Sequence, residues 1–166
     1  MDGDELRRVQ QPIKERYRAE PAAAVVTLRA DGSLSDQEVS CSVQTGRALV
    51  EAGLHPATGG DGSFACSGDM LLQALVACAG VTLRSVATNR GIEVRGEVHA
   101  EGDLDFRGTL GVDRDAPVGF RAIRLRFELE CDDPDADLDT LVATTERYCV
   151  VLQTLVAAPP VAVSRA

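Results

Sequence analysis

The sequence predicts an α+β fold in which antiparallel strands pack with two helices. Segments that alternate apolar and polar residues stand on both sides of a long apolar segment with helical periodicity. A second amphipathic segment follows near the C-terminal end. The resulting order, β-β-β-α-β-β-α-β, contains few parallel crossovers, so it favours antiparallel sheets over a doubly wound parallel one.

Length and composition indicate one folded domain. The chain has 166 residues, of which 45% are hydrophobic, and this is enough to bury a core without disulfide bonds. Residues 1–22 are highly charged and contain Pro12 and Pro21. We expect them to form an arm or a short helix that reaches a partner subunit, and residues 23–166 to form the domain.

The first half of that domain contains strands, a loop and the first helix. Residues 22–46 are typical of strands, and the pair Asp31–Gly32 predicts a hairpin turn. Residues 56–67 form a glycine-rich loop, and the helix that follows is expected to end near Arg90 and Gly91 because glycine favours a helix stop.

The second half repeats the change from strand to helix. Residues 93–105 and 120–131 alternate apolar and polar side chains, as strands with one solvated face do. The acidic residues 132–137 offer caps for a second helix, which is expected to run through Cys149 in ERYCVVLQTL. Residues 161–166 predict a final strand after Pro159 and Pro160.

Several function classes are disfavoured by composition. The formal net charge of −9 argues against a nucleic-acid partner, because a phosphate backbone attracts a basic face. We expect no membrane span, since no run of about twenty apolar residues occurs and Arg84 and Arg90 bound the most hydrophobic helix. The GGDG loop lacks the lysine and hydroxyl of a phosphate-binding loop, so no nucleotide cofactor is expected.

The cysteines point to a reducing compartment. Five are present, an odd number, with no Cys-x-x-Cys pair and no signal-peptide pattern, which disfavours a secreted disulfide framework. We therefore expect a cytoplasmic protein. The only histidines are His55 and His99, and no closely spaced ligand pair accompanies them, so no metal site is expected.

Two of the thiols, Cys78 and Cys149, lie on the apolar faces of the two predicted helices. Free cysteine is among the most buried residue types, so two inert core thiols are one interpretation. Cys78 stands nine residues after Asp69, too deep for the helix dipole alone to activate it. A reactive Cys78 would need a cation from elsewhere in the chain.

The two cysteine segments, CSGDMLLQALVAC and ERYCVVLQTL, resemble those of the OsmC/Ohr proteins, which are thiol-dependent organic hydroperoxide reductases. The resemblance extends from about Val25 to Val163 and includes the order of the elements. It implies an intertwined homodimer whose sheets surround the central helices, with two sites at the dimer interface and no cofactor. It also implies a cytoprotective role against organic peroxides.

The resemblance assigns roles to individual residues. Cys78 would be the peroxidatic thiol and Cys149 the resolving thiol, and a dithiol reductant would restore both. An arginine assists the thiolate in the family, and Arg29 is the candidate here, with Arg18 as the alternative. The family's helix-opening glutamate aligns with Gly68 or Asp69.

Three positions depart from the family pattern or stay open. Asp69 keeps a carboxylate, but nine helical residues place it nearly opposite Cys78, which favours a capping role over a catalytic one. Val150 stands where the family often has proline. Cys66, in the glycine-rich loop, is either an inert thiol or an additional redox partner.

Three functions remain open from the sequence. The first is a peroxidase, and the apolar residues around Cys78 favour organic hydroperoxides over hydrogen peroxide. The second is a noncatalytic protein of the same fold that binds a small apolar ligand or senses redox state, which the missing glutamate suggests. The third is an unrelated enzyme in which Cys78 attacks carbon.

Overall fold

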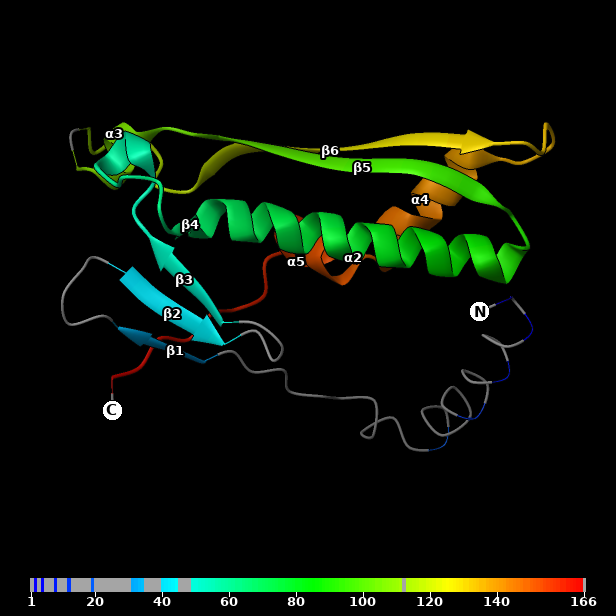
Figure 1. Ribbon diagram of the computed structural model, residues 1–166, viewed down its shortest axis with the longest axis horizontal. Helices are drawn as coiled ribbons and strands as arrows, with labels where there is room; N and C mark the ends of the chain where they lie inside the picture. Colours follow the sequence, from blue (N-terminus) through cyan, green and yellow to red (C-terminus); the bar gives the residue numbers. More distant parts are fainter. Residues whose placement is uncertain are drawn as a thin grey trace. The chain divides into compact units, whose positions relative to one another are not determined.

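The computed structural model describes residues 31–34, 40–44, 49–111 and 113–165, together with positions 2, 4, 8, 12 and 19. The helices and strands, which are labelled in Figure 1 except for the short 3-10 helix η2, are β1 (Asp31–Leu34), β2 (Ser40–Gln44), β3 (Leu49–Gly53), η2 (Pro56–Thr58), β4 (Ala65–Cys66), α2 (Ser67–Arg90), β5 (Val94–Leu104), α3 (Phe106–Thr109), β6 (Phe120–Cys131), α4 (Leu138–Tyr148) and α5 (Val150–Val156). This mixture of antiparallel strands and helices confirms the predicted α+β class.

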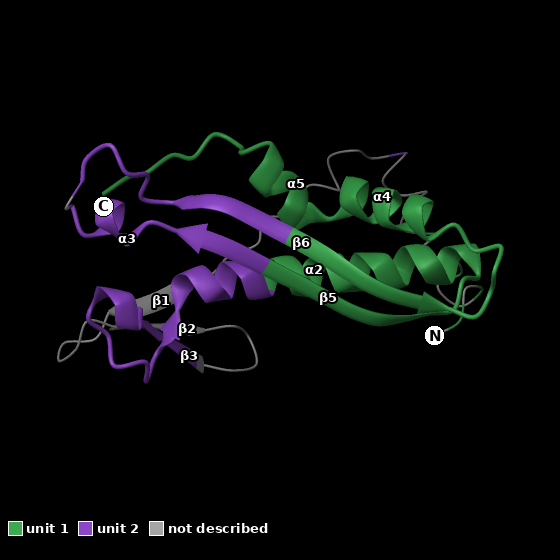
Figure 2. Cartoon of the chain, turned by 90° about the horizontal axis from the view of Figure 1, so that it is seen from above, with its two compact units in different colours: residues 1–15, 74–100, 125–166 green, residues 16–73, 101–124 purple. Residues whose placement is uncertain are grey.

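The chain divides into two compact units, which Figure 2 shows in two colours. Unit 1 contains residues 1–15, 74–100 and 125–166, and unit 2 contains residues 16–73 and 101–124. The long elements α2, β5 and β6 each contribute residues to both units. The predicted arm at residues 1–22 lies mostly outside the described residues, so the division into arm and domain stays a prediction.

The sheet of unit 2 has the strand order β1-β2-β3-β4. The pairs β1–β2 and β2–β3 are antiparallel, and β3–β4 is parallel. The turn expected at Asp31–Gly32 is wrong, because these residues lie in β1 and pair with Gln44 and Val43. The Asp-Gly signal for a turn is local, and the antiparallel pairing of β1 with β2 keeps these two residues extended instead.

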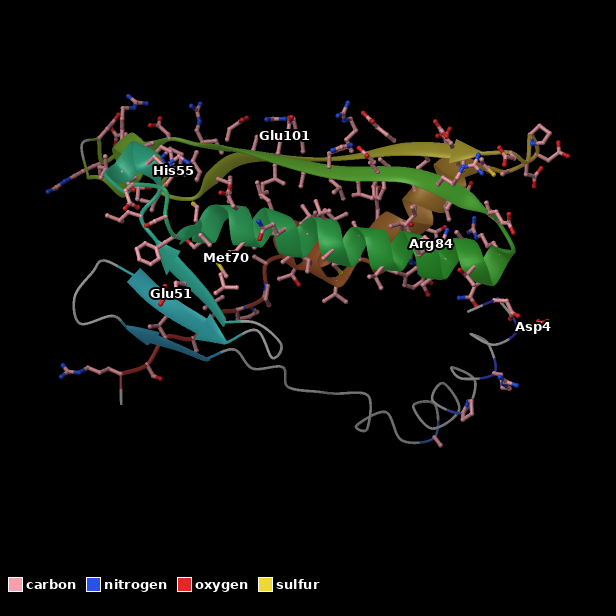
Figure 3. The ribbon with its side chains drawn as sticks, viewed as in Figure 1. Asp4, Glu51, His55, Met70, Arg84 and Glu101 are labelled. Atoms are coloured by element: carbon pink, nitrogen blue, oxygen red, sulfur yellow. The ribbon has the colours of Figure 1, made fainter. Side chains whose placement is uncertain are left out.

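A second sheet consists of the long strands β5 and β6, as the alternating pattern predicted. Charged side chains occupy its exposed face and link the two strands. Arg95 donates from Nη1 and Nη2 to the two carboxylate oxygens of Asp132 at 2.9 and 2.8 Å, and Arg124 donates to Asp103 and Glu101. The side chains on both strands are drawn in Figure 3, with Glu101 labelled.

The core of unit 1 lies under this sheet, along one face of α2. Leu75, Ala79, Leu83 and Ala87 recur at every fourth position of the helix and are buried. Leu83 and Ala87 pack with Val94 of β5 and Leu141 of α4, together with a surrounding group of partly buried side chains: Val86, Ile92, Phe127, Leu129 and Leu138. The repeat of apolar residues at every fourth position therefore produces one continuous apolar stripe along the helix.

Helix α2 ends where the sequence predicted. Gly91 has a φ of +71° and donates its N–H to Thr88 O at 3.1 Å, while Ile92 donates to Ala87 O at 2.9 Å. This pair of hydrogen bonds is the Schellman motif, which requires a left-handed residue after the helix. Two arginines of the helix bond across unit 1: Arg84 (labelled in Figure 3) donates to Val94 O, and Arg90 donates to Thr144 Oγ1.

The second helical region begins as predicted and then departs from the prediction. Asp137 caps α4 by accepting a hydrogen bond from the N–H of Thr140 at 2.8 Å. The single helix expected through Cys149 is wrong, because Cys149 has extended backbone angles (φ −72°, ψ 107°) and separates α4 from α5.

The final strand expected at residues 161–166 is also wrong for residues 161–165, which contain no strand. Val161 and Val163 are 82% and 93% exposed, and no described strand pairs with this segment. Alternation of apolar and polar residues is insufficient for a strand without a partner edge.

Helix α2 is long and apolar enough to cross a membrane by length and composition. No segment of this length and apolar character is expected from the sequence because of Arg84 and Arg90. These two arginines lie in the last two turns of α2. The core helix of a soluble protein passes the same test, so one such helix is weak evidence for a membrane span.

Candidate functional site

The two thiols that the sequence singled out are neighbours within unit 1. Cys78 lies on α2, one residue before the buried Ala79, and it is partly buried. Cys149 is fully buried at the junction of α4 and α5. The thiols are free and lie within hydrogen-bonding reach of each other. The structure therefore brings Cys78 and Cys149 together, as the family resemblance implied.

The break in the helix at Cys149 orients the backbone around the thiols. The N–H of Cys149 closes α4 by donating to Thr145 O, and its carbonyl accepts the first hydrogen bond of α5 from Gln153 N. The first N–H groups of a helix have no acceptor inside it. In α5 these groups belong to Val150, Val151 and Leu152, and they face the two sulfur atoms.

These donors set the protonation of Cys78. Burial raises the pKa of this thiol, but the N–H of Val151, the Cys149 thiol, the N–H of Val150 and the Thr82 hydroxyl outweigh that effect and hold the pKa below its ordinary value. Hydrogen bonds to the charged form favour the thiolate. Cys78 therefore combines partial exposure with thiolate character, the two properties of a reactive cysteine.

Cys149 has the opposite character. Burial raises its pKa, and the neighbouring Cys78 raises it further, although the N–H groups of Leu152 and Val151 lower it in part. A second negative charge beside the Cys78 thiolate is unfavourable. The pair thus consists of one sulfur that favours the thiolate and one that keeps its proton.

Thr82 is fixed one helical turn beyond Cys78. Its hydroxyl donates to the carbonyl of Cys78 at 2.8 Å, which is the usual back-bond of a helical threonine. The same hydroxyl lies close enough to the Cys78 sulfur to lower its pKa. Thr82 is therefore both part of the helix surface and part of the thiol's surroundings.

The other residues predicted for the site are not joined to the thiols by any described contact. Arg29 and its alternative Arg18 lie outside the described residues, so their role stays a prediction. Asp69 is exposed in the first turn of α2. Because α2 is continuous from Ser67 to Arg90, nine residues at about 100° each place Asp69 on the face opposite Cys78.

Gly68, the other position that aligns with the family glutamate, lies against apolar groups of unit 2. A Cβ at Gly68 would stand 3.4 Å from Phe120 Cζ, and 3.6 Å from both Cys66 Sγ and Leu104 Cδ1. Cys66 and Gly68 border a cavity of about 390 Å³ within unit 2, whose wall also includes Leu71, Phe106 and Phe120. The atoms nearest to a Cβ at Gly68 are therefore carbon and sulfur atoms, and no carboxylate is among them.

Residues 60–164 match the family described as OsmC-like protein. The chain belongs to this family. The match covers α2 with Cys78, and α4 and α5 with Cys149 between them, in this OsmC-like chain. No curated protein matches the sequence significantly.

Solved structures share the fold of this OsmC-like chain at low sequence identity. An OsmC-like protein from Mycoplasma pneumoniae is 16% identical, with a TM-score of 0.65 over 80% of this chain and 89% of its own. An organic hydroperoxide resistance protein OsmC from Legionella pneumophila is 15% identical, with a TM-score of 0.59 over 81% and 92%. OhrB of Bacillus subtilis, also named an organic hydroperoxide resistance protein, is 18% identical, with a TM-score of 0.52 over 81% and 94%.

Sequence reasoning missed the backbone donors of α5, and it placed Thr82 on the Cys78 face of the helix without giving its hydroxyl a role. The helix break was hidden because Val150 and Val151 continue the apolar pattern of the segment. One signal could have revealed it: proline, which the family often has at the position of Val150, is favoured at the first residue of a helix. That preference marks Val150 as the start of a new helix and not as the interior of an old one.

Proposed function

We propose that this protein is a thiol-dependent peroxidase that reduces organic hydroperoxides through Cys78 and Cys149. The observation that carries the proposal is the pair of unequal thiols: a partly exposed Cys78 with a lowered pKa beside a buried Cys149 with a raised one. Membership of the OsmC-like family and the names of the Legionella and Bacillus relatives support it.

In the first step the Cys78 thiolate attacks the distal oxygen of the hydroperoxide. A sulfur–oxygen bond forms, the oxygen–oxygen bond breaks, and the alkoxide leaves and takes a proton to give the alcohol. Sulfur is oxidised to a sulfenic acid while the peroxide is reduced. The N–H groups of Val150 and Val151 and the Thr82 hydroxyl favour the thiolate that starts this step.

In the second step the Cys149 thiol attacks the sulfur of the Cys78 sulfenic acid. A disulfide forms and the sulfenic hydroxyl leaves with the thiol proton as water. A dithiol reductant then restores both cysteines by two thiol–disulfide exchanges. Cys149 suits the resolving role because its burial beside Cys78 keeps it away from peroxide and within reach of the oxidised sulfur.

A homodimer fits the surface of the described chain. Val81 is an apolar residue of α2, three positions after Cys78, and it is 72% exposed. Val150 and Val156 of α5 are similarly uncovered. A second copy of the chain would cover these side chains and border the thiols with apolar surface, which favours peroxides with an alkyl or aryl group. We place the protein in the cytoplasm, where a dithiol pool is available.

A noncatalytic role in ligand binding or redox sensing is the second candidate. It is favoured by Gly68, which offers no carboxylate at the position of the family's glutamate and lies among apolar groups. In that case the thiols would exchange with a disulfide or an oxidant without turning over peroxide.

Peroxide consumption distinguishes the two. Reduced protein is supplied with a dithiol and with either cumene hydroperoxide or hydrogen peroxide, in parallel with Cys78→Ser. The peroxidase predicts turnover that prefers the organic peroxide and disappears in the variant. Consumption no faster than that of Cys78→Ser would contradict it and favour the binding role.

A further inference from the structure

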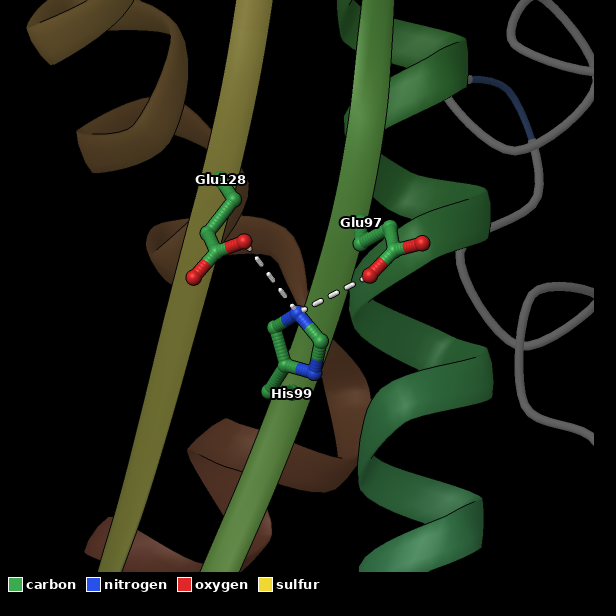
Figure 4. A group of neighbouring side chains, drawn as sticks. All are labelled: Glu97, His99 and Glu128. Atoms are coloured by element: carbon green, nitrogen blue, oxygen red, sulfur yellow. Dashed lines mark ion pairs between the residues drawn. The ribbon is translucent and has the colours of Figure 1, made fainter.

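Outside the thiol site, an imidazole lies between two carboxylates on the exposed face of the second sheet. His99 Nε2 is 3.4 Å from Glu97 Oε2 on the same strand and 3.7 Å from Glu128 Oε2 on the neighbouring strand (Figure 4). The three side chains belong to unit 1. One imidazole and two carboxylates are a donor set that divalent transition metals favour.

The Nε2 atom itself is the unusual feature of this group. The His99 side chain is 37% exposed, yet its Nε2 atom is covered and makes no hydrogen bond with the described residues. Both carboxylates approach it at distances that exceed a normal N–H···O bond. A nitrogen that is covered but not hydrogen-bonded, with its lone pair or proton directed at two oxygens, is suited to share a ligand with them.

We propose that Glu97, His99 and Glu128 form a binding site for a divalent transition-metal ion of the zinc type. All three ligand atoms lie within 4.8 Å of one another. In a tetrahedral zinc site with bonds of about 2.0–2.1 Å, the ligand atoms are about 3.3 Å apart. The distances of 3.4 and 3.7 Å from Nε2 to the two oxygens therefore need only a small contraction around the ion.

The positions of the three residues on β5 and β6 bring their side chains close together. Glu97 and His99 are two residues apart on β5, so they share one face of the strand, and Glu128 stands on the adjacent β6. Three protein ligands leave a fourth position for water, since the Glu97 and Glu128 side chains are 76% and 52% exposed.

Arg126 supports one of the carboxylates from outside the group. Its Nη1 lies 2.8 Å from Glu128 Oε1, while the other oxygen, Oε2, is the one that faces His99. A hydrogen-bonded outer oxygen fixes the orientation of a ligating carboxylate. The same contact would also stabilise a simple ion pair of His99 with the glutamates, so metal binding itself must be measured.

The sequence contains only two histidines, and this gives the site a direct readout. In ¹⁵N–¹H spectra of the imidazoles, His55 is a built-in control because its Nδ1 accepts a hydrogen bond from Ala57 and its ring stacks on Phe106. His99→Gln assigns the signals. Zn²⁺ is titrated into the reduced protein beyond the amount that its thiols can bind, with Mg²⁺ in a parallel sample.

The proposal predicts that Zn²⁺ shifts the Nε2 signal of His99, leaves His55 unchanged, and that Mg²⁺ shifts neither. Glu97→Gln and Glu128→Gln should each weaken the apparent affinity at His99 at least about tenfold. Glu130→Gln, on an exposed position of β6 outside the group, should leave it unchanged. Acidification should weaken binding, because protons compete with the ion for the imidazole nitrogen.

Three results would overturn the proposal. One is a His99 signal that stays in place while the thiols bind Zn²⁺, which would leave an ion pair as the explanation of the group. Another is an equal shift of His55 and His99, which would indicate adventitious surface binding. The third is a His99 shift that keeps its affinity in both glutamine variants, which would show that the carboxylates are not ligands.

Discussion

The backbone N–H of Val150, at the first position of α5, lies beside the sulfur of Cys78 and lowers the pKa of that thiol. Related sequences often have proline at this position, and proline has no backbone N–H. The donor is present in this chain because the residue is valine. Together with the N–H of Val151, it holds the pKa of Cys78 below its ordinary value. The activation of Cys78 in this chain thus includes a backbone group that a proline would remove.

Val150→Pro tests that contribution. Proline suits the first residue of a helix but supplies no donor, so the pKa of Cys78 should rise. A hydrogen bond to a charged group is worth about 1.5 kcal/mol or more when buried, and Cys78 is only partly buried. Alkylation of Cys78 by iodoacetamide near neutral pH should therefore slow several-fold, by about tenfold at most. Val150→Ala keeps the N–H and should react at the parent rate; a Val150→Pro protein as fast as the parent would refute the assignment.

The Thr82 hydroxyl lowers the pKa of Cys78 less than the N–H groups of Val150 and Val151 do. Thr82→Val removes the hydroxyl and keeps the shape of the side chain, so the pKa of Cys78 should rise by less than in Val150→Pro. Thr82→Ser retains the hydroxyl and serves as the control. The pH at which the alkylation rate reaches half its maximum measures the change. A shift in Thr82→Val larger than that in Val150→Pro would make the Thr82 hydroxyl the stronger donor and contradict this order.

The two thiols should also separate by pH. Only the thiolate is nucleophilic, and the pKa of Cys78 is lowered while that of Cys149 is raised. The rate of Cys78 modification should therefore rise with pH and level off below the pH typical of a free cysteine, and it should fall on acidification through that lowered pKa. Cys149 should react only at higher pH and more slowly. Mass spectrometry of peptides at stepped pH gives the order, and earlier modification of Cys149 would be inconsistent with it.

The sequence predicted those features that depend on local pattern. The end of α2 at Gly91 and the start of α4 at Asp137 follow from glycine's left-handed conformation and from aspartate capping, which need no partner from elsewhere. Strands β5 and β6 follow from alternation over more than ten residues each. Helical spacing placed Cys78 and Cys149 on two core-facing helix faces and suggested a site between them, whereas their separate roles came from the family resemblance.

The features that depend on partners escaped prediction. Alternation at residues 161–165 predicts a strand, but a strand forms only beside another edge. The Asp31–Gly32 pair favours a turn locally, yet pairing with β2 keeps it extended. The helix break at Cys149 leaves no sign in the sequence because Val150 and Val151 continue the apolar pattern after it. The Glu97–His99–Glu128 group could not be predicted from local pattern because it joins residues about thirty positions apart.

Two glycines of unit 1 give a matched test of the helix α2. Gly91→Ala should lower the free energy of unfolding by about 1–2 kcal/mol, because φ is +71° there and alanine is strained in that region. Gly80→Ala, in the helix interior with no described atom within 4 Å of its Cβ position, should raise it by about 0.5–1 kcal/mol. Urea-induced unfolding measures both. Equal effects of the two substitutions would show that α2 does not end at Arg90.

The assignment of Cys78 and Cys149 as a peroxidatic and resolving pair is tested most directly by following one round of the reaction. Reduced protein is mixed with one equivalent of cumene hydroperoxide without a reductant, and the products are mapped by mass spectrometry alongside Cys149→Ser. We expect a Cys78–Cys149 disulfide in the parent protein and a sulfenic acid on Cys78, trapped by dimedone, in the variant. Oxidation that leaves Cys78 untouched, or a disulfide that joins Cys78 to Cys66 while Cys149 stays reduced, would contradict the assignment.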